Sequence, residues 1–150
     1  MKQKLKASIE KSFSSVGYPD SYDFQMAVND YDYEDRGKSK PVYWHNIKYE
    51  NLISYGEIIH FFSEDGAKYY LQAYLINLID YPDLFDVVCF ISLMNYLRDV
   101  DVSIFDGSQR QSIIEFLTYY KTYIIDELNH DEDDEKEAEN LIIKFSINDA

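Results

Sequence analysis

The chain has 150 residues, 46% hydrophobic and 17% aromatic, a composition that excludes an intrinsically disordered protein and fits one domain spanning residues 1–150. Its formal net charge of −14 repels nucleic acid and anionic membranes, so neither is an expected partner. The one cysteine, Cys89, excludes an intramolecular disulfide framework and a cysteine-based metal cluster, and its apolar neighbours predict a buried side chain.

The N-terminal segment differs in charge from the rest of the chain. Residues 1–16 carry four lysines and one glutamate, whereas residues 107–150 carry eleven acids and four bases. No apolar stretch follows the first lysines, and no run approaches the roughly 18 apolar residues that span a bilayer. We therefore predict no signal peptide and no membrane partner, and we expect a cytoplasmic protein.

The first half of the chain predicts two amphipathic helices and a long connection. Residues 3–15 show helical spacing of Leu5, Ile9 and Phe13, and Gly17 ends this pattern. Residues 19–42 are rich in turn formers and form a loop-rich connection. A short helix is expected over residues 44–54, closed by Gly56.

Residues 57–62 are apolar and predict either one short strand or a buried approach to the next helix. Helices follow over about 64–80, with Ser63 as N-cap, and over 83–98, and these two would form the centre of the core. Further helices are expected from Ser108 to about Leu128 and over 134–146. The fold class is therefore mainly α, a single compact domain of five to six helices.

No arrangement of residues predicts catalysis, a metal or a cofactor. The three histidines are far apart in sequence and form no ligand motif. Acids alternate from Asp30 to Glu34 as in a calcium loop, but Asp35 stands where glycine is needed and Pro41 where glutamate is needed. No phosphate-binding glycine loop or nucleophile elbow is present. We expect no enzyme activity, no cofactor and no bound metal.

Two acidic segments are the candidate partner-binding sites. The first interleaves acids and tyrosines in the predicted loop, and the second lies in the acidic stretch 126–139. Aromatic side chains anchor interfaces, and charge accelerates encounter with a basic partner. For each segment, a solvated loop or helix start is the simpler alternative. The candidate residues are Asp30, Tyr31, Asp32, Tyr33, Glu34 and Asp35 in the first segment, and Asp131, Glu132, Asp133 and Asp134 in the second.

Two stretches resemble an uncharacterised bacterial family of unknown function. Residues 62–75 (FSEDGAKYYLQAYL) are similar to its signature, in which Phe-Leu-Ser/Thr-Pro-Glu leads into Tyr-Tyr-Leu-Pro-Ala-Tyr-Leu. Residues 105–117 are similar to its Leu-Ser-x-x-Gln-Arg…Phe-Leu segment, whereas Gln72 replaces the proline of the signature. The resemblance implies a mostly helical cytosolic domain with no established activity.

Size, charge and aromatic content also resemble those of bacterial immunity proteins, which neutralise a toxin by covering it. The leading hypothesis is therefore a protein-binding module, an immunity-type protein that captures a basic toxin domain. Two alternatives stay open. One is a small enzyme that uses cleft carboxylates such as Glu64, Asp65 or Asp99, and the other is a structural homo-oligomer, since the sequence is compatible with a homodimer.

Overall fold

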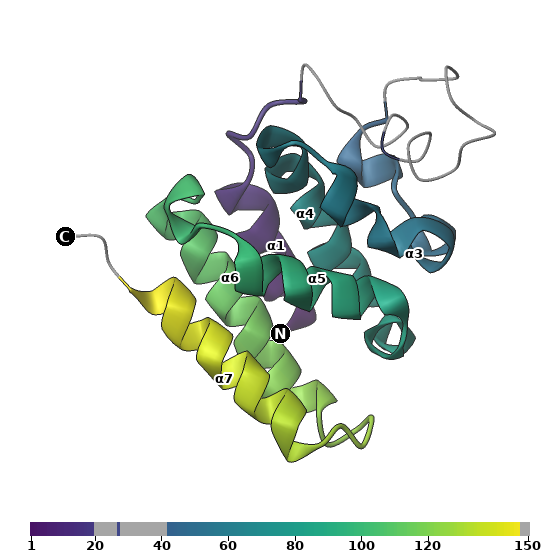
Figure 1. The fold of residues 1–150 in the computed structure, drawn as a ribbon, viewed down its shortest axis with the longest axis vertical. Helices are drawn as coiled ribbons and strands as arrows, with labels where there is room; N and C mark the ends of the chain where they lie inside the picture. The colour runs from purple at the N-terminus through teal and green to yellow at the C-terminus, as the bar shows by residue number, and fades with distance from the viewer. Residues whose placement is uncertain (20–26, 28–41, 148–150) are drawn as a thin grey trace. The chain divides into compact units, whose positions relative to one another are not determined.

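The computed structural model describes residues 1–19, 27 and 42–147, and within these residues the chain is helical with no strand (Figure 1). The prediction of a mainly α protein with five to six helices is confirmed. The six described α-helices are α1 (Lys2–Ser12), α3 (Tyr49–Tyr55), α4 (Glu64–Asp80), α5 (Val88–Asp99), α6 (Gly107–Tyr119) and α7 (Glu132–Ser146). Shorter helical turns are η2 (Trp44–Asn46), η3 (Gly56–Phe61), η4 (Pro82–Asp86), η5 (Val102–Ile104) and the π-helical η6 (Tyr120–Ile124).

The chain forms two compact units that we describe separately. One unit combines Met1–Ser12 with the C-terminal residues from Leu97 onward, and the other comprises Phe13–Tyr96. The prediction of one domain spanning residues 1–150 is not tested by this division and stays a prediction.

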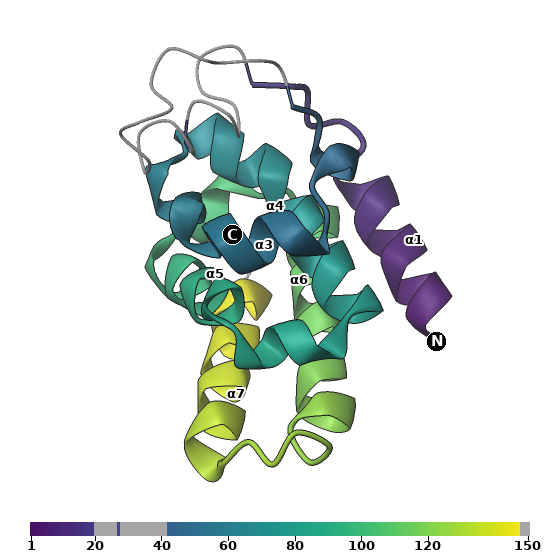
Figure 2. The ribbon, with the colours of Figure 1, turned by 90° about the vertical axis from the view of Figure 1, so that its right-hand side faces the viewer.

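In the first unit α6 contacts both α1 and α7 and lies between them (Figure 2). Small residues let α1 and α6 approach closely: the hydroxyls of Ser12 and Ser112 are 2.7 Å apart, and Ser112 donates to the Ser8 carbonyl at 3.2 Å. Lys144 of α7 donates to the carbonyls of Leu97 and Arg98 at 2.9 and 2.6 Å and so caps the end of α5. The buried apolar side chains of this core include Leu5, Ile9, Ile113, Phe116, Leu117, Ala138, Leu141 and Phe145.

In the second unit α4 is the central element, in contact with η2, η3 and η4. Its bounds match the predicted 64–80, and the predicted N-cap is confirmed because the Gly66 N–H donates to the Ser63 hydroxyl at 3.1 Å. Nearly the whole circumference of α4 is buried. The amide of Asn77 donates to the carbonyls of Ile47 and Ala73, which satisfies this buried polar group.

Tyrosines are part of the core of this unit. Tyr70 and Tyr74 of α4 are fully buried, and their hydroxyls donate to the carbonyls of Val42 and Gly56. Burial raises the pKa of Tyr74 above its ordinary value, so the hydroxyl stays protonated and able to donate. Tyr43 and Tyr81, in contrast, are about half exposed.

The short strand expected at residues 57–62 is wrong, because the segment from Gly56 to Phe61 is a 3₁₀ helix. Ile58 and Ile59 are adjacent, and both are buried, whereas successive side chains of a strand point to opposite faces. The alternative, a buried approach to α4, holds for Ile58 and Ile59 only, because Glu57, His60 and Phe61 are exposed. Gly56 ends α3 as predicted, but in right-handed conformation (φ −59°, ψ −23°), so it is not a left-handed cap.

Other boundaries move by a few residues. The helix expected over 83–98 is divided into η4 and α5. The helix expected to continue to about Leu128 widens into a π-helical turn at Tyr120, and Asn129 adopts a left-handed conformation (φ 56°) before α7. The Cys89 thiol is buried as predicted, and burial raises its pKa to about 12, which leaves it unreactive near neutral pH.

Candidate protein-binding surface

The second predicted segment forms the start of α7. Asp131 is the N-cap: the Asp134 N–H donates to its carboxylate at 3.0 Å, and the Asp131 N–H donates to the Asp134 carboxylate, also at 3.0 Å. This reciprocal pair is a capping box and satisfies two backbone donors. Two of the four predicted residues therefore shape the helix, whereas the other two, Glu132 and Asp133, are exposed to solvent.

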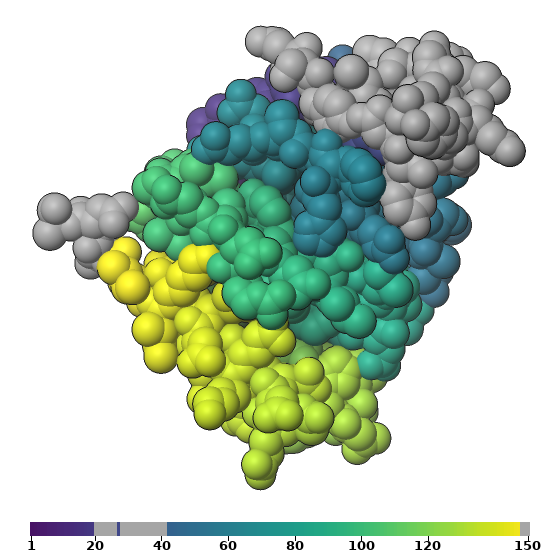
Figure 3. Space-filling model, viewed as in Figure 1, coloured from purple at the N-terminus to yellow at the C-terminus, as the bar shows by residue number. Residues whose placement is uncertain are grey.

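We name residues 126–139 the acidic segment, which carries nine carboxylates and one lysine. Two of its acids face bases of the same unit: Glu139 lies 2.9 Å from the Lys121 ammonium, and Glu137 lies 3.7 Å from the Arg98 guanidinium. Glu132, Asp133 and Glu135 are exposed. In the space-filling view the acidic segment, in yellow-green and yellow, is open to the viewer (Figure 3).

The loop before α7 is held by an aromatic contact. The Tyr120 hydroxyl lies 2.6 Å from Nδ1 of His130, and Tyr120 belongs to the π-helical turn at the end of α6. This bond and the capping box together order the chain on both sides of Asp131. The exposed acids at the start of α7 are therefore presented from a fixed backbone.

Toward the C-terminus two isoleucines are exposed, one in α7 and one directly after it, and the sequence analysis did not predict them. Ile143 is 63% exposed and Ile147 is 57% exposed. Lys136 and Ile143 lie four and eleven residues after Glu132, which places these three residues on the outer side of α7. The spacing alone could have indicated this. Ile147 follows the helix with extended backbone. The outer side of α7 is thus charged at its start and apolar at its end.

Replacing Asp131 with alanine is expected to lower the thermal midpoint of unfolding at pH 7. Asparagine is also a good N-cap, so Asp131→Asn should lower the midpoint much less. The backbone N–H of Asp134 holds the pKa of Asp131 below its usual range, because it donates to the ionised carboxylate. A lowered folded-state pKa stabilises the fold above the ordinary value near 3.8, and this contribution is lost as pH falls through the lowered value. Thermal melts at pH 7 and pH 2 followed by circular dichroism check this. An equal loss for alanine at both pH values would contradict it.

The first predicted segment, Asp30 to Asp35, lies outside the described residues. Its six candidate residues therefore stay predictions.

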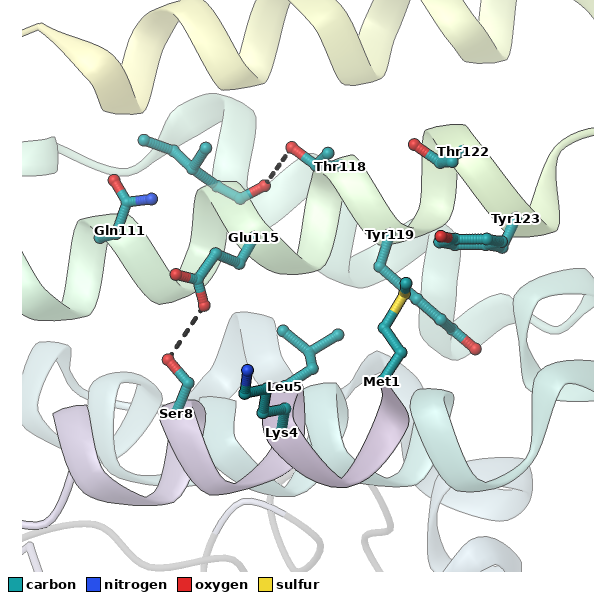
Figure 4. A pocket seen from close by; sticks show the side chains of 11 residues that line it. Met1, Lys4, Leu5, Ser8, Gln111, Glu115, Thr118, Tyr119, Thr122 and Tyr123 are labelled. Carbon is teal, nitrogen blue, oxygen red and sulfur yellow. Dashed lines mark hydrogen bonds between the residues drawn. The ribbon is translucent and has the colours of Figure 1, made fainter.

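A groove between α1 and α6 was not predicted from the sequence. It has a volume of about 630 Å³, and its walls belong to one unit (Figure 4). Ser8 of α1 donates to the Glu115 carboxylate of α6 at 2.9 Å across it. Segments more than 100 residues apart form this groove, which no local pattern reveals. The lining residues are Met1, Lys4, Leu5, Ser8, Gln111, Ile114, Glu115, Thr118, Tyr119, Thr122 and Tyr123.

The chemistry available in this groove is limited. Glu115 is the one carboxylate among its described lining residues, and no histidine or cysteine accompanies it there. A pair of carboxylates for general acid–base work is thus not assembled in the described part of this groove. Glu64, Asp65 and Asp99, the acids of the enzyme hypothesis, do not line it. That hypothesis stays untested.

The described residues contain neither a candidate membrane-spanning helix nor a candidate metal-binding cluster. No helix there combines the length and the apolar character that crossing a membrane requires. No group of three or more His, Cys, Asp or Glu side chains within the described ranges is placed to hold a metal ion.

Comparison of the chain with protein-family models, with curated proteins and with solved structures gave no match in any of the three. The resemblance of residues 62–75 and 105–117 to an uncharacterised family therefore stays a prediction from the sequence.

Proposed function

We propose that this protein is a protein-binding module for a basic partner, an immunity-type protein that neutralises a basic toxin domain in the cytoplasm. The observation that carries the proposal is the set of exposed carboxylates Glu132, Asp133 and Glu135 on the ordered start of α7. Negative potential over such a surface attracts a basic protein and accelerates its association.

The helix dipole explains only part of this charge. Acids in the first turn of a helix are stabilised by the partial positive charge there, so Glu132 and Asp133 also fit a purely structural role. The dipole effect falls off within the first turn. Asp126 and Glu127 precede the helix, so the dipole does not account for them. This surplus of acid supports a binding role.

The proposal is tested by co-expression with a toxin domain encoded beside this gene. The protein is expected to restore growth to cells that express the domain, and the two are expected to copurify in a complex that dissociates as salt is raised. A catalytically inactive toxin variant serves as the binding partner in the copurification. Growth that stays arrested although both proteins are produced would contradict the immunity role.

A further inference from the structure

In the second unit α3 lies alongside the chain segment 81–89, because both of its ends contact that segment. At its start, the Tyr49 ring centroid lies 5.2 Å from that of Tyr81, and the Tyr49 hydroxyl donates to the Asp83 carboxylate at 2.6 Å. At its end, a Cβ added to Gly56 would lie 2.3 Å from the Cβ of Cys89. These contacts, one at each end of α3, hold the helix against residues 81–89.

Exposed apolar side chains follow this line of contact. Tyr49, Ile53 and Gly56 are four and three residues apart, so they share one face of α3, and Ile53 lies between the two contact points. Ile53 is 44% exposed, and Ile91, one turn after Val88 on α5, is 59% exposed. We name these residues the apolar strip. Its members are Ile53, Tyr81, Val88 and Ile91.

Negative charges flank the apolar strip. Exposed acids near it are Glu50, Glu57, Asp83 and Asp86, and the nearest base in sequence is Lys48 at the N-cap of α3. The described residues of this unit carry seven carboxylates and two lysines. The hydrogen bond to Asp83, burial, and the charges of Asp83 and Glu50 raise the pKa of Tyr49, which is the effect expected of a negative local potential.

The charge decides which occupant fits the strip. A second copy of this chain would bring its own acids against these acids, which disfavours a homodimer through this surface. A partner with an apolar face flanked by lysine or arginine would bury the strip and neutralise the acids around it. Amphipathic cationic segments of proteins have this chemistry.

We propose that the apolar strip docks the apolar side chains of a cationic amphipathic segment of a protein partner, with Ile53 and Ile91 as its anchors. This inference rests on the proposed function, because it takes the partner to be basic. The partner's apolar side chains would bind to the second unit, and this contact would not depend on the acids at the start of α7.

The test measures binding of a labelled amphipathic leucine–lysine peptide, a helix with leucines on one face, by fluorescence anisotropy. Ile53→Ser and Ile91→Ser are each expected to weaken binding about tenfold, corresponding to about 1.4 kcal/mol. The matched control is Tyr43→Ser, which removes a similarly exposed apolar side chain outside the strip and is expected to leave the affinity unchanged. A peptide of the same composition with scattered leucines should bind at least tenfold more weakly.

Three results would overturn the inference. The first is unchanged affinity in both strip variants, and the second is an equal loss of affinity in Tyr43→Ser. The third is a homodimer of the unmodified protein in sedimentation that the strip variants dissociate, since a second copy would then occupy the strip. If the strip variants bind normally but the protein still rescues cells from the toxin, the docking inference fails while the proposed function stands. If Ile53→Ser and Ile91→Ser weaken peptide binding as expected but the unmodified protein does not rescue the cells, the proposed function fails while the docking inference stands.

Discussion

Replacing Gly56 with alanine is expected to lower the free energy of unfolding by about 3 kcal/mol, the upper part of the usual range for overpacking. The added Cβ would lie 2.3 Å from the Cβ and 2.7 Å from the Cα of Cys89, distances that real Cβ atoms do not show. These atoms, the Cβ and the backbone of Cys89 in α5, do not move when the side chain changes rotamer. Displacing Gly56 would also disturb its carbonyl, which accepts the hydrogen bond from Tyr74 at 2.6 Å.

Gly107→Ala is the matched control for this substitution. Gly107 is the first residue of α6, and a Cβ added there meets no atom within 4 Å. Alanine favours a helix over glycine by up to about 1 kcal/mol, so this variant should be as stable as the unmodified protein or slightly more stable. Urea denaturation followed by circular dichroism measures the free energy of unfolding of both variants. A Gly56→Ala variant within about 0.5 kcal/mol of the unmodified protein would show that α3 and α5 do not pack as described.

Gly56 also illustrates how far sequence analysis reaches in this chain. Its position after α3 was predicted from the usual role of glycine at helix ends, but its function is close approach to Cys89, a tertiary contact that no local pattern encodes. The bounds of α4, in contrast, were predictable because Ser63 supplies a cap and the apolar residues keep helical spacing over the whole segment. Ile58 and Ile59 were ambiguous, because a short apolar run suits a strand and a buried helical turn equally well.

The sequence predicted that the candidate site is acidic, but not which of its side chains are exposed. Composition located the acidic segment, and the capping role of Asp131 follows from a recognisable spacing to Asp134. Which acids remain exposed depends on the packing of α7 on α6, which turns Ala138 and Leu141 inward. The groove between α1 and α6 depends on Ser8 and Glu115, residues whose partnership is set by the fold alone.

Reversing the charge of Glu132, Asp133 and Glu135 to lysine is expected to slow association with the leucine–lysine peptide about tenfold at low salt. Each replacement changes the charge by two, so the formal net charge rises from −14 to −8. The difference from the unmodified protein should shrink as salt is raised, because exposed charges are screened beyond about 10 Å at 0.1 M ionic strength. Stopped-flow anisotropy over a salt series measures the association rate constant.

A control with the same net charge separates a local effect from a global one. Glu10, Asp65 and Asp99 are exposed acids outside the acidic segment, and their triple replacement by lysine also gives −8. This variant should associate markedly faster than the reversal on α7, because steering depends on where charge lies as well as on its sum. The amide variant Glu132→Gln, Asp133→Asn, Glu135→Gln should fall between the unmodified protein and the reversal, and its circular dichroism spectrum verifies that α7 persists. Equal slowing by the two lysine triples would show that net charge alone attracts the peptide and that the start of α7 has no local role in steering it.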